Sequence, residues 1–379
     1  MSEFTTRKIT DRAGTGAPSF TYGLNIAGSD SGLIGKAITS SGTQPSSPAN
    51  GDLWYDSTND KLYYYVAGEF KQITHVNAVS GIAWGGTRGI TAAGDTNLSN
   101  SHTNVINYFD YTTAGNSTDF GDLTRSRMFA SAVSNASRVV FGVGGNTGNL
   151  LGYDDTLDYI TVATTGNATD FGNRTVTYGG GAVTSDGTYG LFAGGEGANS
   201  GGAPYSTNVI DYITIASTGN ATDFGDLTAS KEYMGNGVIS NGTLGYFFED
   251  NDFANYVTIA TTGNATSTSL STNASGDMGC ASDDSRGLIQ GGATIEYFSI
   301  ATSVSASDFG DTIQTASYTA GASDGTYASF SGGYQFTGGS NYLYDNIQLV
   351  TVQTTGNATQ HGNLSSNVWK LGASSGAAS

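Results

Sequence analysis

Short apolar runs separated by polar residues recur along most of the chain. Val, Ile, Tyr and Phe alternate with polar residues or form brief runs, and clusters of Ser, Thr, Asn and Gly separate one run from the next. No window places apolar residues at helical spacing over several consecutive turns. Because alternation and short runs bounded by turn residues are typical of strands, the pattern predicts an all-β chain with minimal helix.

One phrase of this pattern recurs six times. The copy "IDYITIASTGNATDFGDL" spans residues 210–227. The other copies begin at Ile106, Leu157, Ala254, Ile295 and Ile347. Equivalent positions lie about 41 to 53 residues apart. A period of roughly 50 residues is typical of the blades of a β-propeller and is longer than that of the common helical solenoids.

Each phrase predicts one β-hairpin, and a second hairpin follows it. "YITIA" is typical of a strand, "STGN" of a tight turn and "ATDFGDL" of the returning strand. In the Asp-Phe-Gly triplet we expect the Phe to pack and the Gly-Asp pair to form a turn. The stretch "GGGAVTSDGTYGLFAGG", residues 179–195, then predicts a strand of small residues, an Asp-Gly turn and a return. Two hairpins make a four-stranded blade, with the small-residue strand innermost.

The Gly-Gly pair that closes the second strand, and the strand opening with Tyr after the next loop, resemble the kelch repeat over residues 82–379. The resemblance implies a six-bladed kelch-like β-propeller and says little about function. It is partial, because kelch repeats carry a Trp on the fourth strand. The residues at these positions here are Phe120, Phe171, Phe224, Phe309, Thr268 and His361.

The two ends of the repeat region are expected to share one blade. The last copy stops at "NVWKLGASSGAAS", where its returning strand is due, whereas "GGTRGITAAGD" precedes the first phrase as a returning strand. Pairing of residues 367–374 with residues 88–94 would close the ring and remove an exposed edge. In a competing interpretation, "VNAVSGIAW" at residues 76–84 supplies the inner strand and the C-terminus is a tail. Both interpretations give six blades.

The front of the chain differs from the repeat region, which is expected to span residues 76–379. Residues 44–75 contain "DLWYD", "KLYYYV" and "EFKQI" separated by turn residues, which predicts a small aromatic β-meander. This segment resembles short modules of tail-fibre and other virion structural proteins of tailed bacteriophages, particularly marine cyanobacterial phages. The resemblance implies a virion structural protein that is assembled in the host cytoplasm and displayed on the particle surface.

Residues 1–43 form a leader that is too poor in core-forming side chains to fold alone, and positive charge is concentrated in this front part of the chain. We expect an extended N-terminal arm that becomes ordered when it binds other virion proteins. The alternative is a disordered tail. The expected anchoring residues are Phe4, Arg7, Lys8, Arg12, Phe20 and Tyr22.

Composition and charge narrow the range of partners. Only 12% of the residues are charged, and the formal net charge is -18. This balance argues against a nucleic acid or an anionic membrane as partner, since phosphate binding depends on clustered Lys and Arg. No apolar run approaches the length of a membrane helix, so no membrane insertion is expected. Cys280 is the only cysteine, which excludes an internal disulfide, and it is expected to be a buried small hydrophobe rather than a reactive thiol.

Residues that could carry catalysis are sparse. The three histidines lie far apart without metal-ligand spacing, and the Asp-Phe-Gly triplets lack the Gly-rich and catalytic loops of kinases. A glycan-active propeller enzyme such as a sialidase would need an arginine cluster for the substrate carboxylate. The repeated Asp119, Asp170, Asp223 and Asp308 favour structural hydrogen bonding over calcium binding. We therefore expect no enzyme activity, no cofactor and no metal site.

Long, variable connections at one end of the blades are the candidate ligand-binding region. They are rich in Tyr, Asn, Asp and Gly, which suit sugar or protein recognition on a rigid scaffold, although solvated connectors would have the same composition. The expected function is adhesion to a host-surface glycan or protein by a non-enzymatic virion protein that is oligomeric on the particle. The alternatives are a capsid or tail decoration without a ligand and, less favoured, a glycan-active enzyme. The expected ligand contacts are Tyr153, Tyr205, Phe336, Tyr342 and Tyr344.

Overall fold

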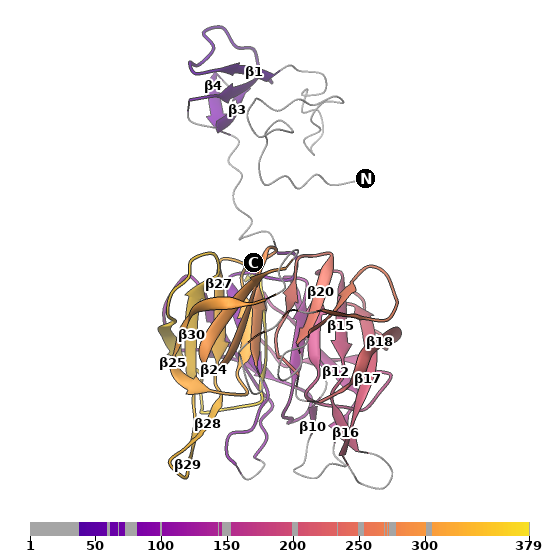
Figure 1. Ribbon diagram of the computed structural model, residues 1–379. Coiled ribbons are helices and arrows are strands. Elements are labelled where there is room, and N and C mark those ends of the chain that lie inside the picture. The colour runs from indigo at the N-terminus through magenta and orange to yellow at the C-terminus, as the bar shows by residue number, and fades with distance from the viewer. Residues whose placement is uncertain are drawn as a thin grey trace. The chain divides into compact units, whose positions relative to one another are not determined.

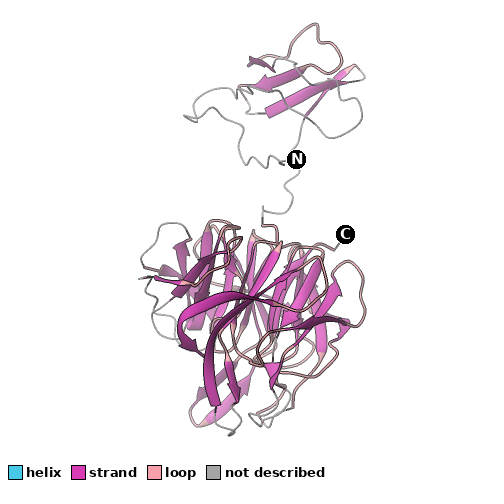
Figure 2. Cartoon of the chain, turned by 90° about the vertical axis from the view of Figure 1, so that its right-hand side faces the viewer, coloured by secondary structure: helices cyan, strands magenta, loops and turns pink. Residues whose placement is uncertain are grey.

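The computed structural model describes residues 38–378 apart from several short segments. The segments outside the description are 59–60, 67, 73–81, 99–100, 143, 146–152, 199–203, 233, 249–253, 269, 271, 273–277 and 301–304. The described residues form strands and turns in mostly antiparallel sheets, which confirms the prediction of an all-β chain (Figure 2). Among them there is no helix that could cross a membrane. The predicted anchoring residues, from Phe4 to Tyr22, lie outside the described residues.

The chain divides into two compact units, Met1–Ala78 and Val79–Ser379, here called the N-terminal and C-terminal units. The described residues of the N-terminal unit form one four-stranded sheet. Its strands, in order across the sheet, are β1 (Ile38–Ser41), β2 (Leu53–Asp56), β3 (Lys61–Val66) and β4 (Glu69–Gln72). β2, β3 and β4 form the expected antiparallel meander, whereas β1 is a parallel edge strand that the sequence pattern did not predict.

Aromatic side chains form the core of this N-terminal sheet. The Trp54 ring stacks on Tyr63, with 4.8 Å between the ring centroids, and meets Phe70 edge-on at 5.4 Å. Such pairs add to the stabilisation from buried area alone. The residues that identified the meander in the sequence are therefore those that hold it together.

In the C-terminal unit, the described residues form six sheets of three to five strands, named here in chain order of their phrases. Sheet 1 consists of β32 (Gly372–Gly376), β5 (Arg88–Ala92), β6 (Val105–Asp110) and β7 (Thr118–Asp122). Sheet 2 consists of β8 (Ser131–Ser134), β9 (Arg138–Gly142), β12 (Thr156–Thr161) and β13 (Thr169–Asn173). Sheet 3 consists of β14 (Ala182–Ser185), β15 (Tyr189–Ala193), β17 (Pro204–Thr214) and β18 (Thr222–Lys231), with β16 (Glu196–Ala198) also paired to β17.

The other three sheets follow the same order with local differences. Sheet 4 consists of β19 (Ile239–Ser240), β20 (Leu244–Phe248), β21 (Ala254–Thr258) and β22 (Thr266–Thr268). Sheet 5 consists of β23 (Gly279–Ser282), β24 (Arg286–Ser299) and β25 (Ser307–Ala316). Sheet 6 consists of β26 (Ala320–Ser323), β27 (Tyr327–Ser331), β30 (Asn346–Thr351) and β31 (Thr359–Asn363). Two short hairpins stand apart, β10 (Gly144–Gly145) with β11 (Tyr153–Asp154) and β28 (Tyr334–Thr337) with β29 (Ser340–Leu343).

The first-named strands of the six sheets, here called the inner strands, contact one another in a cycle. The contacts link β32 with β8, β8 with β14, β14 with β19, β19 with β23, β23 with β26 and β26 with β32. Most inner-strand residues are Gly, Ala or Ser, and they are buried, so backbones can approach closely. Hydroxyl groups form hydrogen bonds between neighbouring inner strands. Ser134 Oγ lies 3.0 Å from Ser374 Oγ, and Thr184 Oγ1 donates to the Ile239 carbonyl at 2.9 Å. These bonds satisfy polar atoms that the close packing buries.

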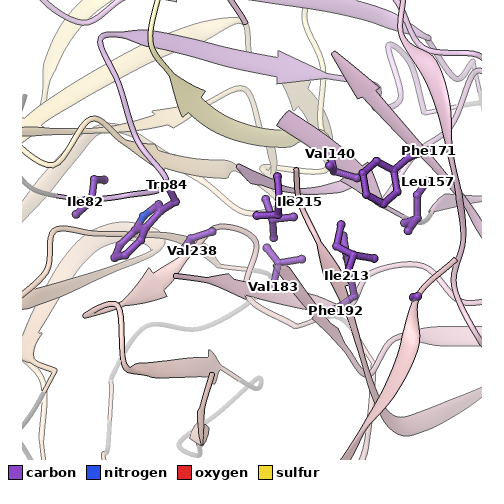
Figure 3. Close-up of a cluster of buried hydrophobic side chains, with 12 residues drawn as sticks. Ile82, Trp84, Val140, Leu157, Phe171, Val183, Phe192, Ile213, Ile215 and Val238 are labelled. Carbon is purple, nitrogen blue, oxygen red and sulfur yellow. The ribbon is translucent and has the colours of Figure 1, made fainter. Parts of the chain in front are cut away.

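The C-terminal strand supplies the inner strand of sheet 1. β32 pairs antiparallel with β5, from Gly372 opposite Ala92 to Gly376 opposite Arg88, as expected for the two ends of the repeat region. Residues 82–84 of the competing interpretation form no strand. Trp84 instead lies buried beside Val238 in an apolar cluster (Figure 3). It fills space between inner strands, where a cavity of only about 10 Å³ remains.

The repeated phrase forms the joint between neighbouring sheets. In sheet 3, the Gly219 N–H donates to the Phe171 carbonyl of sheet 2, and the Ala221 N–H donates to the Asn173 carbonyl, both at 2.8 Å. The Asn220 side-chain oxygen accepts from the Asn173 N–H at 3.1 Å. We call these three bonds the clasp. It recurs with Asn116, Asn167, Asn264 and Asn357, and the first of these joins sheet 1 to sheet 6.

One prediction about the Asp-Phe-Gly triplet, that its Gly-Asp pair forms a turn, is wrong. Its Phe is buried as expected, but its Gly-Asp pair lies within the outer strand at a β-bulge and does not form a turn. Gly172 has a φ of 144°, and a Cβ there would lie 2.3 Å from the Gly219 carbonyl oxygen of the next sheet. Glycine is required because a neighbouring backbone occupies the place of a side chain.

Candidate functional site: the mouth pocket and the hairpin beside it

The segments that enter the six inner strands converge around one pocket, here called the mouth pocket. Its lining residues are Phe129, Ala130, Gly180, Gly181, Met234, Asn236, Met278, Tyr318, Thr319 and Lys370. Each of the six sheets contributes, because these residues lie directly before β8, β14, β19, β23, β26 and β32. The cavity volume is about 20 Å³, which is room for about one water molecule or one small polar group.

Backbone hydrogen bonds tie the rim of the mouth pocket together. The Lys370 N–H donates to the Tyr318 carbonyl at 3.2 Å, and the Phe129 N–H donates to the Lys370 carbonyl at 2.8 Å. The Gly180 N–H in turn donates to the Phe129 carbonyl, and the Met234 N–H donates to the Gly180 carbonyl. The backbone segments that precede the inner strands are far apart in sequence but are joined by these bonds. The bonds fix the backbone from which the rim side chains project.

Three rim residues adopt a backbone conformation that side chains disfavour. Phe129, Tyr318 and Lys370 have φ values of 58°, 58° and 57°, and the equivalent residue of sheet 3 is Gly180, with a φ of 69°. A non-glycine residue in this region costs about 1–3 kcal/mol, and such residues cluster at functional sites. Glycine would remove the strain, as it does in sheet 3. The side chains at these three positions are two aromatic rings and a cation.

Lys370 places one positive charge among aromatic rings. Its Nζ lies 3.8 Å from the ring centroid of Trp369, 4.1 Å from that of Phe129 and 5.2 Å from that of Tyr318. Tyr334 packs against Trp369, with 4.9 Å between the ring centroids. Contacts of a cation with several ring faces restrict the ammonium group to a small volume. The pocket therefore holds a hydrogen-bond donor of fixed position.

Asn236 provides the complementary acceptor. Its Nδ2 donates to the Ala130 carbonyl at 3.0 Å and to the Leu371 carbonyl at 2.5 Å, so the side chain bridges two other sheets. Its Oδ1 is buried and has no hydrogen-bond partner within the described part of the chain, and the same holds for Nε1 of Trp369. Buried polar atoms of native proteins are nearly always paired, by water or a ligand if not by protein. Asn236 lines the pocket, so its Oδ1 indicates a place for a polar group there, whereas Trp369 is not among the lining residues.

A hairpin with exposed aromatic side chains stands beside the mouth pocket. β28 and β29 join through Gly338 and Gly339, whose φ values of 60° and 79° match a two-residue hairpin turn. Phe336 is 63% exposed and Tyr342 is 47% exposed. β10, β16, β28 and β29 lie at the same end of the C-terminal unit (Figure 1). Tyr334 begins β28 and reaches the ring cluster around Lys370, so this hairpin and the pocket form one continuous region.

The structure brings together three of the five predicted contact residues. Phe336, Tyr342 and Tyr344 belong to the β28–β29 hairpin and its exit, and the Tyr344 hydroxyl donates to Gln335 Oε1 at 2.6 Å. Tyr153 lies in β11, where its hydroxyl donates to Glu196 Oε2 at 3.0 Å. Burial raises the pKa of both Tyr153 and Tyr344, which keeps their hydroxyls protonated. Tyr205 belongs to β17, and its side chain lies outside the description.

Sequence reasoning missed a row of buried polar residues at the second position of each phrase. Asp158 in sheet 2 pairs with Arg127, and Asp211 in sheet 3 pairs with Arg174, both at 2.7 Å and fully enclosed. The Thr124 hydroxyl also donates to Asp158 at 2.6 Å, so the carboxylate holds the segment leading toward the mouth pocket. The signal was present in the sequence, because an isolated polar residue between apolar neighbours recurs in every copy.

Three further arginines connect neighbouring sheets. Arg138 lies over the Tyr159 ring, 4.3 Å from its centroid, and donates from Nη1 to the Ile215 carbonyl at 3.0 Å. Arg88 and Arg286 make the equivalent contacts in sheets 1 and 5. Arginines 88, 127, 138, 174 and 286 therefore act as structural ties.

Within the described ranges, no group of three or more His, Cys, Asp or Glu side chains could hold a metal ion. Cys280 is 2% exposed, and burial raises the pKa of its thiol to about 12, as expected of an inert buried side chain.

No protein-family model matches the chain, and no curated protein matches it significantly. The arrangement offers recognition by fixed aromatic and polar groups.

Proposed function

We propose that the C-terminal unit is a six-bladed β-propeller whose loop-bearing end binds a ligand, and that the chain is a non-enzymatic adhesion protein. The cyclic contacts of the inner strands and the clasp between sheet 6 and sheet 1 support the propeller. One observation carries the binding function. The β28–β29 hairpin carries exposed Phe336 and Tyr342 and, through Tyr334, reaches a pocket whose rim has three non-glycine residues in a left-handed backbone.

We further infer that the chain is a virion structural protein of a tailed phage and that its N-terminal unit attaches it to the particle. The support is the resemblance of the aromatic meander to virion modules, together with a front part that is close to neutral whereas the whole chain has a net charge of -18. The partner of the C-terminal unit is a host-surface glycan or protein. Decoration of a capsid or tail without a ligand is the competing function, and a binding experiment separates the two.

Replacing Phe336 and Tyr342 together by Ala should weaken binding to host cells at least about tenfold, because aromatic anchors dominate many interfaces. Stability should hardly change, since both side chains are largely exposed. The measurement is retention of labelled protein on host cells across a concentration series. Ile313→Ala is the control, because Ile313 is 46% exposed on a different strand. Equal retention of both variants and the parent would favour a decoration without a ligand.

A fragment from Val76 to Ser379 should fold as a monomer, retain host-cell binding and no longer join the particle. The physical reason is that the C-terminal unit has its own buried clusters and internal hydrogen bonds. Size-exclusion chromatography, a melting curve and incorporation into particles measure the three properties. Normal incorporation of the fragment would contradict attachment through the N-terminal unit.

A further inference from the structure

We propose that the mouth pocket is a subsite for one hydroxyl group of a neutral sugar. This inference rests on the proposed binding function and names its ligand class. The relevant atoms are Nζ of Lys370, Oδ1 of Asn236 and the rings around them. The hairpin residues would contact other parts of the same ligand.

A hydroxyl group matches the polar atoms of the pocket. It can accept a hydrogen bond from the Lys370 ammonium group and donate one to Asn236 Oδ1, which is a buried acceptor without a partner among the described residues. The cavity volume of about 20 Å³ suits a group of that size. A water molecule would occupy the place in the free protein, and a sugar hydroxyl would reproduce its bonds on displacing it.

The rings beside the pocket suit the rest of a sugar. Tyr318, Tyr334 and Trp369 form a connected cluster, with ring-centroid distances of 6.4 Å, 5.0 Å and 4.9 Å between its pairs. Tyr318 and Trp369 are half-buried, so part of their surface stays accessible. Aromatic surface beside a few placed polar groups is the usual composition of a small-ligand site.

Charge favours a neutral sugar over an acidic one. The chain carries a formal net charge of -18, which opposes the approach of an anionic ligand. Within the pocket, the Asn236 oxygen would face the oxygen of a carboxylate, and neither could donate a hydrogen bond. A hydroxyl avoids both conflicts. Lys370 then acts as a hydrogen-bond donor held among aromatic rings.

Saturation-transfer NMR on the full chain tests the proposal. The probes are the methyl glycosides of glucose, galactose, mannose and N-acetylglucosamine, with methyl glucuronide as the acidic comparison, all at millimolar concentration. We expect transfer to at least one neutral glycoside and weaker transfer to the glucuronide. The Lys370→Gly and Lys370→Met variants should each bind at least about tenfold more weakly. Ile313→Ala serves as the control, because Ile313 is exposed on β25 and belongs neither to the pocket nor to the hairpin.

The two substitutions at Lys370 separate a binding role from a structural one. Gly relieves the left-handed backbone, so the melting temperature of Lys370→Gly should be retained or raised while binding falls. Met keeps the backbone strain and the aliphatic stem but removes the donor. Unchanged sugar binding by both variants would overturn the proposal, as would the absence of transfer to every neutral glycoside or a preference for the glucuronide.

Host-cell binding distinguishes failure of this inference from failure of the proposed function. If the Phe336 and Tyr342 double variant loses cell binding while both Lys370 variants retain it, the sugar subsite is wrong and adhesion stands. If none of these variants changes cell binding, both proposals fail. Loss of cell binding in the Lys370 variants, together with loss of glycoside transfer, supports both.

Discussion

Deletion of Gly372–Ser379 should lower the melting temperature by about 10 °C or more. The deletion removes β32, whose five residues are all buried and pair with β5. With backbone hydrogen bonds contributing about 1 kcal/mol each, and contacts to β8 and β26 lost as well, the loss is on the order of 5 kcal/mol. A change of 1 kcal/mol shifts the melting temperature by roughly 2–4 °C in large domains.

Deletion of Ala378 and Ser379 alone is the matched control, because it leaves β32 and its pairing intact. Differential scanning calorimetry at matched protein concentration compares the two deletions with the parent. If both deletion variants have the melting temperature of the parent, the unit is stable without β32. That result would agree with the interpretation that treats the C-terminus as a tail. A loss confined to the longer deletion shows that β32 stabilises the unit.

Local patterns in the sequence predicted the strands and turns well, because each phrase repeats its own signals. "YITIA" and the small-residue strands have periodicity and composition that are visible without any tertiary contact. The expected pairing of residues 367–374 with residues 88–94 could be derived, because the last copy lacks a returning strand and a returning strand precedes the first phrase. The parallel strand β1 could not, since "ITSS" carries no signal that distinguishes it from a loop.

The mouth pocket could not be predicted in the same way. Phe129, Tyr318 and Lys370 meet only after the sheets have assembled, and no short motif contains any two of them. A signal was nevertheless present, because Gly180 occupies the equivalent position of another copy and indicates a left-handed backbone. Comparing copies at this position would have identified the three strained residues.

The sequences of sheets 4 and 5 depart from the phrase at the positions that form the clasp elsewhere, and residues 301–304 lie outside the described residues. The phrase of sheet 4 has "ATSTSLS" where other copies have "ATDFGDL", and the phrase of sheet 5 has "TSVSAS" in place of "TTGNAT". In sheet 4, Thr268 pairs directly with Ala254, without the bulge that makes room for the neighbouring turn. Both sequences differ at clasp positions, as expected if the phrase recurs because of the clasp.

Gly172→Ala should destabilise the protein by about 3 kcal/mol or more and lower its melting temperature by roughly 6–12 °C. The new Cβ would lie 2.3 Å from the Gly219 carbonyl oxygen, so the turn of sheet 3 must move away. Its movement breaks the two backbone bonds and the Asn220 bond of that clasp. Backbone strain at a φ of 144° adds to this loss.

Gly219→Ala is the matched control on the other half of the same clasp. Its φ of 155° imposes a similar backbone strain, but a Cβ there meets nothing within 4 Å. We expect a loss of only about 1–2 kcal/mol from strain. The difference between the two melting temperatures therefore measures the contact between sheets. Equal melting temperatures would mean that the Gly172 glycine reflects local backbone geometry and that the clasp does not explain the repeated phrase.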